Sequence, residues 1–579
     1  MGKCRSPLYP PLLLAVFLSA AAPLLGWAAP GTGLEKNAPR MPAIPRMLAA
    51  MTVEEKVGQL FMVFFEGPEV SDFCREAALS RNVGGFILYK HTGNTQSPAQ
   101  VARLCAGLTA LADPRRPWTR PLISIDQEGG PVARLTSGAT WFPSQMAVAA
   151  APGAPRLARA MAKAQAAELA ALGINVNFAP VADVNVNPDN PVIGARSFGA
   201  SPSAVARLTR EAVRGYAGSG VLCCPKHFPG HGDTDVDSHL GLPVLHHDAA
   251  ALNRVDFPPF RAAIAAGAPM IMTAHVETPA LNAAPGLPAT LSAKALTGVL
   301  RREMRFDGLI VTDSLGMGAV EKTFGSATAA LKSFQAGADL LLFGADKGFS
   351  PEAYQAAFDR ILAAVNSGEI SRARLDASVR RILIAKGRLG PLTKPASSEP
   401  GETEPGERLT ARLATAKHVA LAREIAAQSL TLARGRAGDF PFDGKKTAIV
   451  WPRKPVPEIE AAVRDMAARH GCGLVVTEPD PDAAAVDRAA AEAAGYERVV
   501  ILSRDAWRAP GQAALIARLA KDKPSALLAA ATGGPYDARV AGDAAWFVAA
   551  YCDVPETIAA LGRAIFEGKG FPGRLPVRL

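Results

Sequence analysis

The chain has 579 residues, of which 49% are hydrophobic and 20% are charged. This composition excludes wholesale disorder, and the length exceeds what a single hydrophobic core supports, so we expect two or three domains. The formal net charge is +10. Because lysines and arginines do not gather in runs, the charge gives no support for a nucleic-acid partner.

The N-terminus has the pattern of a secretory signal. Lys3 and Arg5 precede an apolar stretch over residues 11–26, which ends in the small-residue sequence Gly26-Trp27-Ala28-Ala29. We expect residues 1–28 to be a signal peptide and the protein to be exported to the periplasm or the extracellular space, with no stable membrane insertion after cleavage. The apolar stretch is shorter than the roughly 20 residues of a membrane span, so an uncleaved anchor is the alternative.

Eight short apolar runs then alternate with alanine-rich segments of helical period. Uninterrupted apolar runs are typical of strands buried on both faces, and helices between them are typical of parallel crossovers. The pattern predicts an α/β fold with a (β/α)8 TIM-like barrel over residues 41–390, and an open doubly wound sheet is the alternative. The runs cover residues 57–65, 83–89, 121–125, 174–180, 220–224, 270–274, 308–311 and 338–343.

A change of composition marks the end of this region. The helical pattern over residues 351–389 stops at Gly390-Pro391, and the following residues are rich in Pro, Gly, Ser and Glu. Such a segment cannot bury a core, so residues 391–408 are predicted to be a linker. Residues 409–579 are then predicted to form a smaller αβα sandwich domain, with strand-like runs at residues 447–451, 473–477, 499–503, 525–532 and 545–551.

In a barrel of this kind, functional side chains gather where the strands end, because the loops after the strands form one rim. Five of the eight apolar runs are followed closely by a titratable side chain. We therefore expect a site at this rim, to which these positions contribute: Asp126, Asp183, Lys226 with His227, His275 and Asp313.

The segment KHFPGHGDTDVDSH, residues 226–239, holds the densest group of such side chains. His and Asp are ligands for zinc or manganese, so a metal site is one interpretation. His227 and His231 have the spacing of a helical zinc motif, but Pro229 and Gly230 between them would break that helix. A solvated loop without chemistry is a second interpretation.

We favour a third interpretation, in which this segment supplies a general acid. Asp237 and His239 are two residues apart, so the carboxylate can orient the imidazole and hold its proton. A second carboxylate is then needed, and Asp313 follows a predicted strand directly. An aspartate at that position can act as a nucleophile toward a carbon with oxocarbenium character, although a helix N-cap is the structural alternative.

With Gly241-Leu242-Pro243 after it, this segment closely resembles the signature of glycoside hydrolase family 3, in its β-N-acetylglucosaminidase branch. The resemblance runs in unbroken order from about Met47 to Leu389, and the region after the linker resembles the αβα domain of two-domain members. The other matching motifs are Ile125-Asp126-Gln127-Glu128-Gly129-Gly130 with Arg134, Ala179-Pro180-Val181-Ala182-Asp183-Val184-Asn185, Ile193-Gly194-Ala195-Arg196-Ser197-Phe198, Thr312-Asp313-Ser314-Leu315-Gly316-Met317 and Gly534-Pro535-Tyr536-Asp537.

The resemblance implies retaining, exo-acting hydrolysis of terminal β-linked N-acetylglucosamine without a metal or other cofactor. It implies that Asp313 is the nucleophile, that His239 is the acid/base and that Asp237 is its partner. The residues that would bind the sugar are Asp126, Arg134, Arg196, Lys226 and His227. The expected partner is an oligosaccharide.

Several alternatives stay open for the substrate and the reaction. For an exported member, cell-wall fragments with N-acetylglucosamine linked to N-acetylmuramic acid, or chitin oligomers, are the expected substrates. A neutral imidazole would repel an anionic acceptor less than a carboxylate does, so phosphorolysis is the first alternative reaction. A β-glucosidase of the same family and a sugar-binding protein without turnover are the others.

Overall fold

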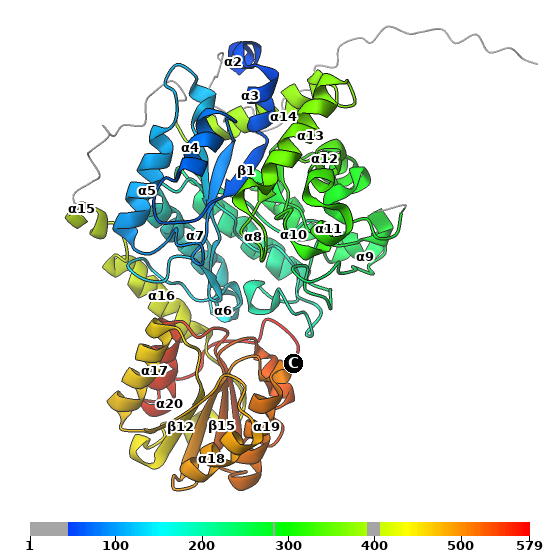
Figure 1. Cartoon of the computed structure of the whole chain (residues 1–579). Helices are drawn as coiled ribbons and strands as arrows, with labels where there is room; N and C mark the ends of the chain where they lie inside the picture. The colour runs from blue at the N-terminus through cyan, green and yellow to red at the C-terminus, as the bar shows by residue number, and fades with distance from the viewer. Residues whose placement is uncertain (1–43, 282–283, 391–405) are drawn as a thin grey trace, which may run out of the picture. The chain divides into compact units, whose positions relative to one another are not determined.

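A computed structural model of the chain describes residues 44–281, 284–390 and 406–579. The predicted signal peptide and most of the predicted linker lie outside these residues, so both stay predictions. The described residues belong to one compact unit, in which two large sheets are arranged along the chain, one in the first part and one in the second (Figure 1).

The first part holds eight parallel strands at the positions of the eight predicted runs. Six form one sheet in the order β10-β1-β2-β3-β6-β7, and β8 pairs with β9. Isolated bridges from Phe228 to Thr273 and from Val311 to Leu340 join the sheet of two to both edges of the sheet of six. The strands are β1 Phe61–Phe64, β2 Gly85–Leu88, β3 Leu122–Ile125, β6 Val176–Asn177, β7 Leu222–Cys223, β8 Met270–Met272, β9 Leu309–Val311 and β10 Leu341–Phe343.

This order, with each strand beside its neighbours in the sequence and β10 against β1, is that of a TIM-like domain. All residues of these eight strands are buried, as expected for a parallel sheet enclosed by helices. A small antiparallel hairpin, β4 Gln127–Gly129 and β5 Val132–Ala133, follows β3. It carries part of the site described below.

The helices of this part connect successive strands and cover the sheet (Figure 1). Six of them begin where a Ser, Thr or Asp accepts a hydrogen bond from a backbone N–H of the first turn, as Ser71, Ser97 and Ser371 do. The helices are α2 Ile44–Ala50, α3 Val53–Gly58, α4 Asp72–Leu79, α5 Pro98–Ala110, α6 Gln145–Ala150, α7 Ala154–Ala171, α8 Pro202–Tyr216, α9 Ala249–Arg254, α10 Phe257–Ala265, the π-helix Lys294–Glu303, α11 Gly318–Phe324, α12 Ser326–Ala336, α13 Tyr354–Asn366 and α14 Arg372–Arg388.

Two predicted boundaries were wrong in this part. The apolar run 57–65 begins inside α3, because Thr52 and Glu55 form a capping box that starts a helix there. The predicted helical stretch 351–389 is divided into α13 and α14. The break falls at Ser367-Gly368, where Gly368 has a positive φ of 82° that most residues avoid.

The second part is a six-stranded sheet in the order β11-β16-β15-β14-β12-β13. The five predicted strands are all present and parallel, and sequence reasoning missed the sixth, the antiparallel edge strand β11. The strands are β11 Thr431–Arg434, β12 Thr447–Pro452, β13 Gly473–Thr477, β14 Arg498–Ser503, β15 Leu527–Ala531 and β16 Trp546–Ala549, and the helices are α15 Gly406–Thr410, α16 Ala416–Ser429, α17 Pro457–His470, α18 Ala483–Ala493, α19 Pro510–Asp522 and α20 Pro555–Phe566.

Both faces of this sheet are covered, as in a three-layer αβα arrangement. Successive strand residues alternate between two hydrophobic clusters: Ala448 and Val450 pack in one, Ile449 and Trp451 in the other. Helices α18 and α19 contribute to the first cluster and α16, α17 and α20 to the second, as Figure 1 shows for the labelled helices.

Side chains from the first part also contact the second part. The Trp141 ring belongs to the second hydrophobic cluster. Ser144 Oγ donates to the carbonyl oxygen of Tyr551 at 3.0 Å, and His418 Nδ1 lies 2.8 Å from Glu168 Oε1. In the described ranges, no helix has the length and apolar character that a bilayer crossing requires.

Candidate active site

A cavity of about 560 Å³ opens where the strands of the first part end. All the predicted sugar-binding residues, together with His239 and Asp313, line it. They come from loops after β3, β6, β7 and β9 and meet at one rim, where the strand-end argument had expected Asp126, Lys226 with His227, and Asp313. The structure therefore brings together side chains that are up to 187 residues apart in the sequence.

A chain of alternating charges forms one wall of the cavity. Lys226 Nζ lies 2.8 Å from Asp126 Oδ1 and 2.7 Å from Glu128 Oε1. Arg196 pairs with Glu128 through two nitrogens, at 2.8 and 2.9 Å. Arg134 reaches Asp126 at 3.3 Å, and its Nε is buried without a hydrogen-bond partner in the described part of the chain. Three cations thus face two carboxylates, with a donor left for a ligand.

Burial alone would raise the pKa values of both carboxyl groups in this wall. The charges of the neighbouring Lys and Arg side chains outweigh burial, so the pKa of Asp126 lies below its usual range and that of Glu128 falls to about 2. Both groups are ionised at neutral pH. They can accept hydrogen bonds from sugar hydroxyls, and the cations can donate to hydroxyl or acetamido oxygens.

Asp183 holds His227 in one orientation beneath this wall. Asp183 Oδ2 lies 2.7 Å from His227 Nδ1, and Asp183 Oδ1 accepts the backbone N–H groups of His227 and His231 at 3.2 and 2.8 Å. The Asp183 side chain is fully buried. With Nδ1 as donor to the carboxylate, His227 Nε2 is left as an acceptor, and Arg196 lies 3.4 Å from it.

Asp313 lies two residues beyond β9, at the base of the cavity. Its Oδ1 accepts the N–H of Ser314 at 2.8 Å, and in the described residues no Lys or Arg forms an ion pair with it. Burial opposes its ionisation, but the neighbouring His227, His275 and His239 side chains outweigh burial and lower its pKa. Asp313 is therefore an ionised carboxylate without a tight ion pair, which is what a nucleophile requires.

His239 and Asp237 lie on the loop that follows β7. Asp237 Oδ1 is 2.8 Å from His239 Nδ1 and accepts the backbone N–H of the same residue at 2.9 Å. This hydrogen bond is the main reason why the pKa of His239 is raised, and nearby Asp313 adds to it. The His239 side chain is 58% exposed, so its Nε2 can meet a ligand as a proton donor near neutral pH.

Both sides of this loop are fixed to the rest of the protein. On one side, His231 Nε2 lies 3.0 Å from Ser238 Oγ, and burial lowers the pKa of His231 to about 4. On the other, Ala319 N donates to the carbonyl of Ser238 at 3.2 Å and Lys322 Nζ to that of Leu240 at 2.9 Å. These contacts hold His239 at the edge of the cavity.

His275, at the end of β8, does not line the cavity. It is fully buried, with Nε2 2.8 Å from the carbonyl oxygen of Ser314 and Nδ1 3.0 Å from Thr290 Oγ1. Burial lowers its pKa. His275 therefore supports the backbone next to Asp313 from behind, and the expectation that its side chain faces the site was wrong.

The metal interpretation of residues 226–239 finds no support in the geometry. His227 and His231 each bond to protein groups, and their rings meet edge to face with centroids 6.0 Å apart. Across residues 44–281, 284–390 and 406–579, no group of three or more His, Cys, Asp or Glu side chains is arranged to hold a metal ion.

Sequence reasoning missed three residues of the site. Glu128 stands in a motif quoted above but was not assigned to the site, and its ion pairs with Arg196 and Lys226 are what place it there. Tyr89 directly follows β2, and Asp346 lies three residues beyond β10. Counting the first three residues after each strand, and including Tyr, would have found both.

Asp346 places a further carboxyl group near the nucleophile. Ser314 Oγ donates to Asp346 Oδ2, and the same Oγ accepts the N–H of Gly344 at 2.8 Å. Burial raises the pKa of Asp346 to about 6, and the charge of Asp313 adds to the rise. One of the two neighbouring carboxyl groups is thus ionised and the other is partly protonated near pH 6.

Comparisons with known proteins identify the family of the chain. Residues 52–385 match the family described as "Glycosyl hydrolase family 3 N terminal domain". The β-hexosaminidase A of Pseudoalteromonas piscicida is 37% identical over 375 residues, which are 58% of this chain and 62% of that protein. The β-hexosaminidase LpqI of Mycobacterium tuberculosis is 33% identical over 369 residues, which are 62% of this chain and 89% of that protein.

The likeness extends to solved structures and includes the second part of the chain. The structure of a glycoside hydrolase family 3 β-N-acetylglucosaminidase from Paenibacillus sp. str. FPU-7 is similar with a TM-score of 0.83 and 39% sequence identity, and the match covers 91% of this chain and 99% of that one. The fold, the rim of charged side chains and the sequence matches lead to one conclusion. The chain is a glycoside hydrolase and belongs to glycosyl hydrolase family 3.

Proposed function

We propose that this protein is an exo-acting, retaining glycosidase that removes terminal β-linked N-acetylglucosamine. The single observation that carries the proposal is that Asp313, an ionised carboxylate without an ion pair in the described residues, and His239, which Asp237 orients, line one cavity with a charged wall. The names of the β-hexosaminidase relatives and the Paenibacillus β-N-acetylglucosaminidase support the choice of sugar.

In the proposed first step, Asp313 attacks the anomeric carbon while His239 Nε2 gives its proton to the leaving oxygen. The glycosidic bond breaks, a glycosyl-aspartate ester forms and the aglycone departs with the proton. In the second step, neutral His239 takes a proton from water, whose oxygen attacks the anomeric carbon and releases Asp313. Asp237 keeps His239 Nδ1 engaged in both steps, so that Nε2 carries the transferred proton.

The wall of Asp126, Lys226, Glu128, Arg196 and Arg134 is proposed to bind the hydroxyl and acetamido groups of the sugar. Buried, ionised partners that are already paired need little rearrangement when a sugar displaces water. We further propose that the substrates are cell-wall fragments or chitin-type oligosaccharides and that the protein is exported. The latter rests on the signal-like pattern of residues 1–28.

The test is Asp313→Asn, assayed with an aryl N-acetyl-β-glucosaminide without added metal. Removal of a nucleophile should lower kcat by roughly 10³-fold or more, while Asp235→Asn, an exposed carboxylate of the neighbouring loop, should leave it unchanged. Wild-type protein treated with a fluorinated glycoside that slows hydrolysis of the intermediate should be labelled within residues 308–316. Near-normal turnover by Asp313→Asn, or a label elsewhere, would refute the nucleophile assignment.

The same assay separates the alternatives. Added inorganic phosphate should not change the product, whereas a phosphorylase would release N-acetylglucosamine 1-phosphate. The rate with the matching aryl β-glucoside should be far lower, since the donors of the wall would lose the acetamido oxygen.

A further inference from the structure

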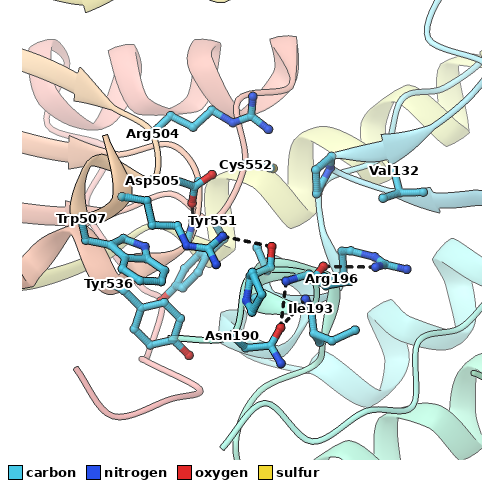
Figure 2. A pocket seen from close by; sticks show the side chains of 18 of the residues that line it. Val132, Asn190, Ile193, Arg196, Arg504, Asp505, Trp507, Tyr536, Tyr551 and Cys552 are labelled. Atoms are coloured by element: carbon cyan, nitrogen blue, oxygen red, sulfur yellow. Dashed lines mark hydrogen bonds between the residues drawn. The ribbon is translucent and has the colours of Figure 1, made fainter. Parts of the chain in front are cut away.

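A second cavity, of about 300 Å³, lies between loops of the two parts of the chain. Figure 2 shows its walls: Asn190 and Ile193 lie on a loop of the first part, with Arg196 beside them, and Trp507 and Tyr536 lie on loops of the second. Asp237 and His239 also line it. The second part therefore reaches the proposed acid, although nothing in its sequence pointed to the site.

This cavity adjoins the sugar-binding cavity. Val132, Val192, Arg196 and His239 line both, whereas Asp313 lines only the sugar-binding cavity. An acid must contact the oxygen of the leaving group, and a nucleophile must contact the anomeric carbon. A leaving group therefore extends from the anomeric carbon past His239, and the second cavity is the space beyond that imidazole.

We propose that this cavity binds the leaving-group sugar and that Arg508 and Trp507 of the second part select a leaving-group sugar that carries a carboxylate. The inference rests on the proposed glycosidase function and deepens it. It assigns part of the substrate recognition to residues after β14, outside the region that matches the family's N-terminal domain.

The charges on this side of the cavity favour an anion. Arg508 donates to the carbonyl oxygen of Pro191 at 3.0 Å, and within the described residues it has no carboxylate partner. Arg504 lies 3.5 Å from Asp553, but Lys454 is closer to the same carboxylate, at 3.2 Å. Asp505 is the remaining carboxylate from the second part at this wall. Lys454 and Arg504 therefore share Asp553, and within the described residues no ion pair joins Arg508 to Asp505, so Arg508 can pair with one more anion.

Trp507 offers a surface for a sugar ring and an unused donor. Its side chain is half-buried, and its Nε1 is buried with no hydrogen-bond partner in the described part of the chain. The Arg508 guanidinium lies over the same ring, 4.5 Å from its centroid. A guanidinium held against an indole is pre-oriented, so it loses little freedom when it binds a carboxylate.

The loop that carries these residues is held in place. Asp537 accepts hydrogen bonds from Ser503 Oγ at 2.7 Å and from Trp507 N at 3.4 Å. From the other side, Asn185 Nδ2 donates to Tyr536 Oη at 2.8 Å. The cavity is thus formed before any ligand binds, which favours a recognition role.

The experiment compares three substrates in wild type and Arg508→Met. They are an aryl N-acetyl-β-glucosaminide, the neutral disaccharide N,N′-diacetylchitobiose, and N-acetylglucosamine β-1,4-linked to a sugar with a 3-O-lactyl carboxylate. Loss of a charged hydrogen-bond donor should lower kcat/KM for the acidic disaccharide roughly 10-fold or more. The other two substrates should change less than about 2-fold, because neither presents a charge to Arg508. Arg488→Met, an exposed arginine on α18, is the matched control.

The methyl ester of the acidic disaccharide provides a second arm. Wild type should cleave the ester as slowly as Arg508→Met cleaves the acid, and Arg508→Met should not distinguish the two. An equal loss on all three substrates, or an Arg508→Met variant that still prefers the acid over the ester, would overturn the proposal. So would a wild type that cleaves the aryl glycoside but neither disaccharide.

Inorganic phosphate is the other anion that could occupy this site. If phosphate gave N-acetylglucosamine 1-phosphate and Arg508→Met lost only that product, the site would bind an acceptor anion and the leaving-group assignment would be overturned. Failure of the proposed function itself looks different, because wild type would then release no N-acetylglucosamine from the aryl substrate.

Discussion

Two Asp–His pairs in the first part of the chain have the same chemistry but different surroundings. Asp183 and His227 are buried, with side-chain exposures of 0% and 7%, whereas Asp237 and His239 are exposed by 32% and 58%. The buried carboxylate accepts three hydrogen bonds from two residues, and the exposed one orients a single imidazole. The buried pair therefore fixes the geometry of the site, whereas the exposed pair can exchange a proton with a ligand or with water.

Of changes in the two pairs, the largest effect should follow from loss of the exposed imidazole. We expect His239→Ala to lower kcat/KM by about 10²- to 10⁴-fold for an unactivated disaccharide, because the leaving oxygen then departs without a proton. An aryl glycoside with a nitrophenolate leaving group should be affected much less. Steady-state kinetics on both substrates, with the exposed neighbour His246→Ala as control, measure this. Equal losses on the two substrates would contradict the acid role.

Loss of the buried carboxylate should act on geometry instead. In Asp183→Asn, an amide N–H₂ facing His227 Nδ1 would force the other tautomer and point Nε2–H at the Arg196 guanidinium 3.4 Å away. We expect the free energy of unfolding to fall by about 1–3 kcal/mol and kcat/KM to fall by a similar factor for both substrates. Urea unfolding and kinetics measure this. If the fall in kcat/KM of Asp183→Asn differed between the two substrates, the buried pair would also take part in proton transfer to the leaving group, and the proposed difference between the two pairs would be wrong.

The pH profile of activity tests whether Asp237 sets the pKa of His239. The active form has Asp313 ionised and His239 protonated, so activity is lost at low pH when Asp313 binds a proton and at high pH when His239 loses one. Because Asp237 raises the pKa of His239, Asp237→Asn should move the alkaline limb of kcat/KM to lower pH. Asp235→Asn should not move it. An unchanged alkaline limb in Asp237→Asn would show that this carboxylate does not set the titration.

The smallest effect concerns a third imidazole, which has carboxylates on both sides. His247 lies 2.9 Å from Asp233 and 2.7 Å from Asp256, and these hydrogen bonds raise its pKa to about 10. Its charged form stabilises the fold fully below the ordinary pKa near 6.5, and this contribution is lost as pH rises through 10.

We therefore expect wild type to lose roughly 1–2 kcal/mol of stability between pH 7 and pH 10 that His247→Gln does not lose. Urea midpoints at the two pH values measure this, with His246→Gln as the control. An identical pH dependence in wild type and His247→Gln would mean that the contacts of His247 with Asp233 and Asp256 add nothing to the stability of the fold.

Much of the first part could be predicted because its signals are local. Uninterrupted apolar runs mark the parallel strands, and the residue after a strand end is placed at the rim by topology alone, as for Asp126 and Asp313. The same rule failed for His275, because the direction of a side chain depends on packing with Thr290 and Ser314, which no local pattern records.

The sequence by itself determined the eight parallel strands of the first part, five of the six strands of the second large sheet, the Asp–His spacing and the residues that the family motif shares. Only the tertiary structure decided which carboxylates are paired and which cavity the second part joins. Trp507 lies 268 residues beyond His239, and a meeting at that separation depends on how two hydrophobic cores pack. Ionisation was decided in the same way, because neighbouring cations make Glu128 a stronger acid, whereas burial makes Asp346 a weaker one.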